Sequence, residues 1–370
     1  MKILLVNSER GFRGGEFQTA ALAEGLSERG FEVHVAAASG SRLAEVLSDG
    51  IPVHRFAFEP LPVWTPVMLG RLVRRIGADL VHAQTSRAHT HAWMATRLMR
   101  DAPPLVVSRR VAFATSGGFL ARRKYLSGVE HYIPISEAAA DSLRSAGVPD
   151  ERMTLIPSGV RVSSFRDAEG DRSLLAAWGA PEGRFVIGTV AALEKEKGLD
   201  VLVRAAGIVL RGRDDCTFVI IGEGAEIGSL REGIDRAGLS RRVVIAEPVR
   251  RLEIVMPLFT LFVLPSLVEG MSTSLAAAMA SGRAIVASRT GGIPEVVGDD
   301  AAVLVPPGDA EALAAAIGML LSDPRRREEL AEIASRRAGR FDIGRTIEAT
   351  ITLYRSLERD RQARHLHHHG

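Results

Sequence analysis

The feature that most constrains this chain is a repeated alternation of short apolar runs with longer segments of helical pattern. Residues 3–6 form an apolar run, residues 17–29 have the pattern of a helix, and residues 32–37 form a second apolar run. This alternation predicts a parallel sheet covered by helices, because parallel strands are usually connected through a helix. The runs contain few polar residues, as expected of strands that are buried on both faces. We therefore expect an α/β fold of the Rossmann-like type.

The alternation occurs in two series, which indicates two domains. A polar, glycine-containing stretch over residues 163–183 separates the series, and 370 residues are enough for two separate cores. We predict a first Rossmann-like domain over residues 1–165 and a second over residues 166–342, with a last helix within 343–370 that packs back on the first. Further strands are expected at residues 80–83, 104–108, 131–135, 153–157, 185–188, 217–221, 243–246, 261–265, 284–287 and 302–305.

Composition indicates a folded protein without disulfides. Hydrophobic residues make up 46% of the chain and charged residues 25%. The single cysteine, Cys216, lies in an apolar run, which predicts a buried strand residue rather than a catalytic thiol. The first apolar run is too short for a signal peptide, and no stretch approaches the roughly 18 residues that span a bilayer. We therefore expect a cytoplasmic protein, and we exclude the histidine-rich residues 365–370 from metal-site reasoning.

A glycine-containing segment follows the first predicted strand and precedes the first predicted helix. Gly14 and Gly15 allow backbone N–H groups and a helix N-terminus to approach an anion closely. A dinucleotide-binding motif would have the spacing Gly-x-Gly-x-x-Gly and an acid at the end of the second strand. Neither is present, which argues against a nicotinamide oxidoreductase. A simple tight turn is the alternative interpretation.

Two further segments with candidate chemistry lie in the second half. Lys195 and Lys197 come just before a predicted helix, where a lysine can meet a diphosphate, although such a lysine is more often a solvated surface residue. Glu269 follows the predicted strand 261–265. A carboxylate there can bind sugar hydroxyls, while the amides of a helix start bind phosphate. The amides concerned are those of Gly270, Met271, Ser272 and Thr273.

Taken in order along the chain, these segments resemble the motifs of the retaining glycosyltransferases of family 4. That resemblance implies the GT-B fold, in which two Rossmann-like domains face a central cleft and a C-terminal helix crosses back to the N-terminal domain. It covers nearly the whole chain. The segments that carry it are residues 14–15, 79–82, 157–160, 196–198, 269–270, 278–282, 291–295 and 305–309.

The resemblance implies transfer of a hexose from a nucleoside-diphosphate sugar, with UDP preferred to GDP, without a metal ion or other cofactor. By the same resemblance Gly14 and Gly15 approach the donor diphosphate or the acceptor, and Lys197 neutralises the diphosphate. Glu269 and the amides after it hold the transferred sugar. The acceptor is expected to be a glycan or glycolipid of the cell envelope, such as a lipopolysaccharide core.

The chain departs from the family pattern at three positions. Ala277 stands where a second carboxylate usually holds the donor ribose, and Ala192 stands where an arginine usually accompanies the lysine. Gln84 occupies the position of a histidine that touches the transferred sugar, so we include it among the candidate catalytic residues. Two alternatives therefore stay open, namely a non-catalytic nucleotide-sugar-binding descendant of the fold and a sugar-nucleotide epimerase.

The first half also carries the candidate acceptor side, with His82, Arg87, His89 and Arg109; for His89 a lone surface histidine is the alternative. Between residues 60 and 130 the chain has eleven Arg or Lys against three acids. This bias, beside apolar residues, predicts reversible docking to an anionic inner-leaflet surface, although a merely soluble surface is as consistent with it. No nucleic-acid recognition motif accompanies the charge. The apolar neighbours are Phe113, Phe119, Leu120, Tyr125 and Leu126.

Overall fold

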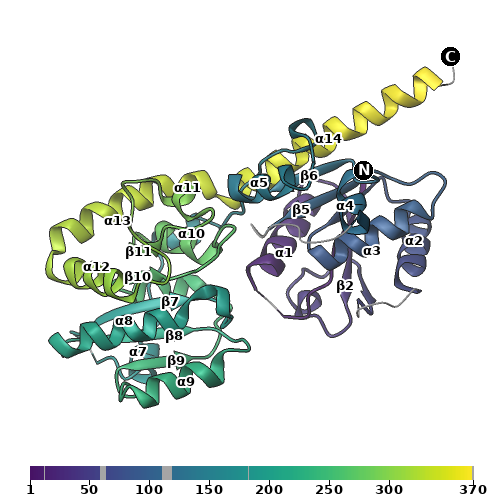
Figure 1. Ribbon diagram of the computed structural model, residues 1–370. Helices are drawn as coiled ribbons and strands as arrows, with labels where there is room; N and C mark the ends of the chain where they lie inside the picture. The colour runs from purple at the N-terminus through teal and green to yellow at the C-terminus, as the bar shows by residue number, and fades with distance from the viewer. Residues whose placement is uncertain (12, 59–63, 111–118, 182, 369–370) are drawn as a thin grey trace. The chain divides into compact units, whose positions relative to one another are not determined.

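The computed structural model describes residues 1–11, 13–58, 64–110, 119–181 and 183–368 and divides into two compact units. The first comprises Met1–Gly159 and Ile343–Gly370, and the second comprises Val160–Asp342 (Figure 1). The second unit thus begins at Val160 and not at residue 166. Val160 donates its N–H to the carbonyl oxygen of Phe341 over 2.9 Å and forms a parallel bridge with Asp342. The chain therefore enters and leaves this unit at adjacent points.

The first unit contains a six-stranded parallel sheet in the order β3-β2-β1-β4-β5-β6. An α-helix connects each of these strands to the next, as the alternating pattern predicts, except between β2 and β3, where the connection contains only a 3₁₀ turn. The strands are β1 (Lys2–Asn7), β2 (Glu32–Ala38), β3 (Val53–Phe56), β4 (Leu80–Ala83), β5 (Leu105–Arg109) and β6 (His131–Pro134).

Helices cover both faces of this sheet. Ile3 and Leu5 of β1 point to one face and pack with α1 and the C-terminal helix α14, while Leu4 and Val6 point to the other and pack with α2 and α3. This division follows from the two-residue period of a strand. The helices of the unit are α1 (Gly14–Ser27), α2 (Trp64–Ile76), α3 (Ser86–Arg97), α4 (Phe119–Leu126), α5 (Glu137–Arg144) and α14 (Ile343–His368), with short 3₁₀ turns η1 (Arg42–Glu45) and η2 (Asp150–Arg152).

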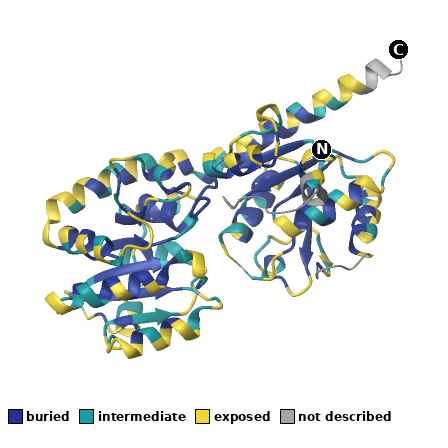
Figure 2. Cartoon of the chain, viewed as in Figure 1, coloured by how far each residue is buried: buried dark blue, intermediate teal, exposed yellow. Residues whose placement is uncertain are grey.

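The second unit repeats the architecture with the parallel order β12-β11-β10-β7-β8-β9. Its strands are β7 (Phe185–Val190), β8 (Cys216–Ile221), β9 (Val243–Ala246), β10 (Leu261–Leu264), β11 (Ala284–Ser288) and β12 (Val303–Val305). Helices α8 and α12 pack on one face, and α10 lies against β10 and β11. The central strands are buried and the outer helix faces are exposed (Figure 2).

The helices and turns of the second unit follow its strands in sequence. The α-helices are α6 (Ser163–Arg166), α7 (Ser173–Ala177), α8 (Leu199–Gly212), α9 (Ile227–Arg236), α10 (Thr273–Ala280), α11 (Ile293–Val297), α12 (Ala310–Ser322) and α13 (Pro324–Ala338). The 3₁₀ turns are η3 (Lys195–Lys197), η4 (Leu252–Ile254), η5 (Met256–Leu258) and η6 (Gly339–Phe341).

Two strand predictions need correction. The edge strand β3 was not predicted, because it is short and only partly buried. The strand predicted over residues 153–157 is wrong, since only Met153 forms an isolated bridge, with Tyr132. The N–H of Thr154 and that of Ile156 do bond to carbonyl oxygens of β6. However, Pro134 has no N–H with which β6 could return a bond, and a regular ladder does not form.

The single cysteine is a buried strand residue, as predicted from the sequence. Cys216 is fully buried at the start of β8, and burial raises the pKa of its thiol. A thiol held protonated in an apolar interior is not a nucleophile at neutral pH. Among the described residues, no helix combines the length and apolar character needed to cross a bilayer.

Candidate functional site

In each sheet the order of the strands reverses beside the first strand of the unit. In the second unit this reversal lies between β7 and β10, which are direct neighbours. Loops that leave the carboxyl ends of two such strands diverge to opposite faces, and the opening between them is the usual ligand site of open parallel sheets. The loop after β7 carries Lys197 and the loop after β10 carries Glu269.

These two predicted residues meet at the sheet edge. The Lys197 ammonium donates to Oε2 of Glu269 over 2.6 Å, and Ser266 Oγ donates to the same oxygen over 3.3 Å. The Glu269 side chain is 8% exposed and that of Lys197 is 25% exposed. Without a ligand, the two charges therefore neutralise one another, and the lysine is the partner with better access to solvent.

The loop that carries Glu269 is held from two sides. The N–H of Leu267 bonds to the carbonyl oxygen of Glu196 over 2.7 Å, and the N–H of Gly292 bonds to the carbonyl oxygen of Glu269 over 3.1 Å. A Cβ at Gly291, which has φ +50°, would overlap that carbonyl oxygen, and a Cβ at Gly198, with φ +60°, would overlap the carbonyl oxygen of Pro265. These glycines belong to the matched motifs but were not predicted as site residues. Their position beside the loop explains why glycine is needed there.

Helix α10 begins immediately after this loop, next to Glu269. Ser272 is its N-cap, and its Oγ accepts the N–H of Leu275 over 3.2 Å. The amides of residues 270–273 therefore lie at the positive end of α10, where an anion is stabilised. The structure places the predicted donor-binding residues Gly270, Met271 and Thr273 in one short turn, although the Met271 side chain itself is buried.

The three departures from the family pattern have different surroundings. Ala277 is fully buried in α10, so a glutamate at this position could enter only if the interior repacked. Ala192 is half-buried in the loop after β7, and Lys195 is exposed in the turn η3. The second unit thus presents one buried carboxylate with one lysine, and the ribose carboxylate of the family has no substitute at its own position.

In the first unit, Gly14 and Gly15 form the first two residues of α1, after β1. The helix start is fixed by Glu16, whose Oε2 accepts the N–H of Arg13 over 3.0 Å and whose Oε1 accepts from Asn7 Nδ2 over 3.4 Å. Burial raises the pKa of the Glu16 carboxyl. The predicted glycine turn is therefore a helix N-terminus at the carboxyl edge of the sheet.

The predicted catalytic residue Gln84 lies at the same edge, after β4. Its Oε1 accepts from Arg110 Nη2 over 2.6 Å, and Arg110 Nη1 donates to Ser158 Oγ over 3.3 Å. Arg110 follows β5 directly and approaches Gly15, since a Cβ there would be 3.8 Å from Arg110 Cδ. Sequence reasoning noted Arg110 only as part of the basic region. The available signal was a charged residue at the carboxyl end of a central strand.

Three of the four predicted acceptor-side residues are buried. His82 bonds through Nδ1 to the Tyr354 hydroxyl over 2.5 Å and through Nε2 to Ser108 Oγ over 2.9 Å. Arg109 donates to Ser142 Oγ over 3.1 Å. His89 packs edge-on against Tyr125 and is 2% exposed, so the expectation of a surface histidine is wrong. Arg87 is exposed on α3.

The basic region, residues 60–130, is only partly exposed on the surface. Phe113 lies outside the described residues, as do the side chains of Phe119, Leu120 and Arg122. Of the two apolar neighbours whose side chains the structure describes, Tyr125 belongs to the core and Leu126 is 40% exposed. The exposed cations of this region that the structure describes are Arg71, Arg74, Arg75, Arg87, Arg97, Arg100 and Arg123.

His82 predicts an acid-sensitive first unit. Burial is the main cause that lowers the pKa of His82 to about 3, and the charge of Arg110 adds to it. The unfolded chain, with a pKa near 6.5, binds the proton first as the pH falls, so the stability is present above pH 6.5 and is lost towards pH 3. Between pH 7 and pH 5 this one residue should lower the free energy of unfolding by about 2 kcal/mol.

The measurement is urea unfolding at both pH values, followed by hydrogen exchange of peptides covering β4 and β5. In His82→Gln the difference between pH 7 and pH 5 should shrink by about 2 kcal/mol, because an amide keeps hydrogen-bonding groups but does not titrate. A variant with the full wild-type pH dependence would show that another group is responsible.

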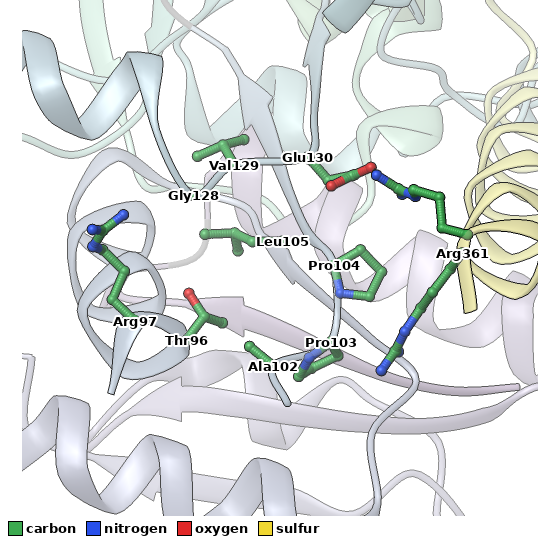
Figure 3. Close-up of a pocket in the computed structure, with 11 residues that line it drawn as sticks. Thr96, Arg97, Ala102, Pro103, Pro104, Leu105, Gly128, Val129, Glu130 and Arg361 are labelled. Carbon is green, nitrogen blue, oxygen red and sulfur yellow. The ribbon is translucent and has the colours of Figure 1, made fainter. Parts of the chain in front are cut away.

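A separate cavity of about 370 Å³ lies at the opposite edge of the first sheet, where β5 and β6 begin. Arg97 of α3 and Arg361 of α14 lie on either side of it (Figure 3). Arg364, also from α14, donates to Glu130 Oε1 over 2.6 Å. None of the predicted site residues lines this cavity, so it is not part of the candidate site. In the described part of the chain, no group of three or more His, Cys, Asp or Glu residues is placed to hold a metal ion.

Comparison with known proteins gives a consistent result for both units. Residues 12–164 match the family model described as Glycosyltransferase Family 4, and residues 184–323 match that described as Glycosyl transferases group 1. The lipopolysaccharide core biosynthesis mannosyltransferase LpcC of Rhizobium leguminosarum bv. viciae is 31% identical over 66% of this chain and 71% of its own length. A D-inositol 3-phosphate glycosyltransferase of Kineococcus radiotolerans is 27% identical over 92% of this chain and 90% of its own. Among solved structures, Anabaena HepE in complex with UDP and glucose has a TM-score of 0.84 at 22% identity, covering 96% of this chain and 100% of that one.

Proposed function

Because the chain belongs to the family 4 glycosyltransferases, we propose that it transfers a hexose from a nucleoside-diphosphate sugar to a glycan or glycolipid of the cell envelope. The family and the GT-B fold predicted from the motifs are both confirmed. The observation that carries the proposal is the contact between Lys197 and Glu269 at the strand-order reversal of the second sheet. It joins the two groups that a sugar diphosphate needs, a cation and a carboxylate, beside a helix N-terminus.

The roles follow from the charges. Lys197 is the more exposed partner and can turn from Glu269 to the donor diphosphate. Glu269 then has an oxygen free to accept hydrogen bonds from hydroxyls of the sugar, while the amides of residues 270–273 lie beside the diphosphate. Fixed donors that meet charge developing on a departing diphosphate are the main electrostatic contribution to such a reaction. UDP is our preferred donor nucleotide, ahead of GDP.

We propose retention of the anomeric configuration and independence of metal ions. In a retaining transfer the acceptor oxygen attacks C1 on the face from which the diphosphate departs, and its proton leaves with the diphosphate. The positive charge of Lys197 and the start of α10 can stabilise that departing group in the role that a metal ion has in other transferases. This part of the proposal rests on the family resemblance and on the chemistry of these groups.

The test is calorimetric titration with UDP, GDP, ADP and their common sugar conjugates in the presence of a chelator. One nucleotide should bind saturably, and Lys197→Met should weaken it by about tenfold or more, because a charged hydrogen bond to phosphate is lost. Lys195→Met makes the same charge change in the same turn and shows whether position or net charge decides the affinity. Binding that needs a divalent cation would contradict the metal-independent mechanism.

The alternatives make different predictions in the same experiment. A non-catalytic descendant would bind a nucleotide sugar but would release no free nucleotide from it with any acceptor. A sugar-nucleotide epimerase would convert the sugar without an acceptor and would need an acid–base pair close to it. Glu269 and Lys197 are oppositely charged and lie in direct contact at this sheet edge.

We also propose that α2 and α3 of the first unit dock reversibly on an anionic inner-leaflet surface. Neither helix contains an acidic residue, and the two pack against one another. On α2, Trp64 is 74% exposed and Met68 48% exposed, and Arg71 and Arg75 follow on the same face at helical spacing. On α3, Leu98 is 66% exposed just after the last turn. Exposed apolar side chains flanked by arginines are typical of an interfacial segment.

Vesicle binding checks this surface. The protein should sediment with vesicles rich in phosphatidylglycerol at low salt and be released at high salt. The double variant Arg71→Glu, Arg75→Glu should weaken the partition by at least about tenfold, since each arginine near an anionic surface is worth about 1 kcal/mol. The matched control reverses two exposed arginines of α9, Arg231 and Arg236. Equal losses in both double variants would indicate a general charge effect and contradict a specific docking surface.

A further inference from the structure

Arg110 is held at the carboxyl edge of the first sheet by neutral partners. Its two Nη atoms donate to the side chains of Gln84 and Ser158, which are far apart in the sequence. Its Cδ lies close to Gly15 at the start of α1. The guanidinium is therefore fixed between the loop after β4, the segment that follows η2 and the N-terminus of the fourteen-residue helix α1.

The charge of Arg110 has no ion-pair partner among the described residues. Glu16 is the acid whose charge acts most strongly on it, but the Glu16 oxygens accept hydrogen bonds from Arg13 and Asn7. Burial lowers the pKa of Arg110 to about 10, so it stays protonated at neutral pH. A guanidinium that loses water without gaining a carboxylate destabilises the free protein. Such an arrangement is expected where a ligand supplies the missing charge.

The surroundings of Arg110 also contain more donors than acceptors. In the described part of the chain, Gln84 Nε2 and Arg110 Nε are buried and find no acceptor, and Gln84 itself is 1% exposed. The Gln84 oxygen, which would otherwise accept from a sugar hydroxyl, is occupied by Arg110. The positive end of α1 faces the same edge. The two unpartnered atoms are therefore both hydrogen-bond donors, and the helix N-terminus beside them attracts negative charge.

Arg109, the last residue of β5, has surroundings that differ from those of Arg110. It precedes Arg110 and points to the opposite face, where Ser142 Oγ accepts its Nε over 3.1 Å and the Tyr125 hydroxyl lies 3.5 Å from its Nη1. Arg109 is integrated in the packing of α5 and β5. Two arginines adjacent in sequence thus have different surroundings, and only Arg110 lies at the helix N-terminus.

We propose that Arg110, with Gln84 and the N-terminus of α1, binds a phosphate or carboxylate group of a substrate. This inference rests on the proposed function, and it assigns an anionic group to one of the two sugar substrates. A planar guanidinium matches phosphate and carboxylate oxygens in a fixed geometry, which a neutral hexose does not offer. The anion would be either the donor diphosphate or an acidic group on the sugar that the first unit binds.

The test uses the full-length protein with inorganic phosphate, D-glucuronate and, as the uncharged counterpart of glucuronate, D-glucose. Hydrogen exchange of peptides covering β1 to α1 and β4 to α3 measures binding at this edge. Phosphate and glucuronate should protect these peptides saturably, whereas glucose should not. Arg110→Met should weaken both anions at least tenfold, and Arg110→Lys should restore part of the phosphate affinity. Arg55→Met, an exposed arginine of β3, is the control.

Titration with UDP separates the two sources of the anion. If Arg110→Met weakens UDP together with phosphate, the anion is the donor diphosphate; if UDP is unaffected while glucuronate is lost, the anion belongs to the other sugar substrate. The inference is overturned if glucose protects as well as glucuronate, or if Arg110→Met leaves both anions unchanged. A wild-type protein that binds UDP but neither anion would overturn this inference alone. Anion binding without nucleotide binding would instead contradict the proposed function.

Discussion

Replacing Glu269 with glutamine should lower the transfer rate by on the order of 10²–10³-fold while leaving the affinity for UDP unchanged or up to about tenfold higher. In the wild-type protein the Glu269 carboxylate accepts a hydrogen bond from the Lys197 ammonium over 2.6 Å. Without it, Lys197 no longer has to leave a counter-ion when a diphosphate arrives. The sugar, however, loses a charged acceptor for its hydroxyls. The preference for the nucleotide sugar over the bare nucleotide should therefore disappear, as measured by calorimetry beside initial rates.

Substitution of the partner residue, Lys197, provides the control. Lys197→Met leaves the Glu269 carboxylate at 8% exposure with only the Ser266 hydroxyl as a side-chain hydrogen-bond partner among the described residues, so it should also destabilise the second unit. Glu269→Gln leaves a lysine that reaches water and should have little effect on stability. The double variant should differ from the sum of the single variants by about 0.5–3 kcal/mol, because the two groups are in contact. A loss of UDP affinity in Glu269→Gln equal to that in Lys197→Met would contradict the assigned roles.

The sequence predicted the fold well because the fold depends on patterns that are local. Buried parallel strands are continuous apolar runs, and eleven of the twelve predicted runs lie on or within one residue of observed strands. Helix caps are local features as well: Ser136 accepts the N–H of Ala139 at the start of α5, and Gly147 has φ +93° beyond its end. The strand prediction for residues 153–157 is wrong because of the neighbouring strand, β6. Whether that run pairs depends on Pro134, which no property of the run itself reveals.

The site was predicted less completely, because several roles depend on packing between distant segments. The family resemblance assigned Glu269 and Lys197 to the same donor, and in the structure both follow strands that meet at the reversal point of the sheet. His82 and His89 could not be recognised as buried, because their rings are covered by Tyr354 of α14 and by Tyr125 of α4. Arg109 and Arg110 look alike in sequence. Only the alternation of side chains at the end of β5 separates a packed arginine from one that lacks a counter-ion.

Gly291→Ala should reduce transfer by about 10²-fold or more without removing any group that touches a substrate. Gly291 has φ +50°, which costs an alanine about 1–2 kcal/mol, and its new Cβ would overlap the carbonyl oxygen of Glu269. The obstacle is backbone, so Glu269 must shift or the turn at residues 290–292 must open. A displacement of about 1 Å at a catalytic group is enough for a 10²-fold loss. Initial rates and urea unfolding should be measured on the same samples.

Gly282→Ala separates strain from displacement. Gly282 also has a positive φ, +60°, at the end of α10, but a Cβ there meets nothing within 4 Å. It should therefore lose a similar 1–2 kcal/mol of stability from the backbone conformation alone and keep its activity. If Gly282→Ala lost as much activity as Gly291→Ala, general destabilisation of the unit would explain both. If only Gly291→Ala is inactive, the position of the Glu269 backbone limits the reaction, and Gly198→Ala, which would press on Pro265 from the other side of the same loop, should be inactive for the same reason.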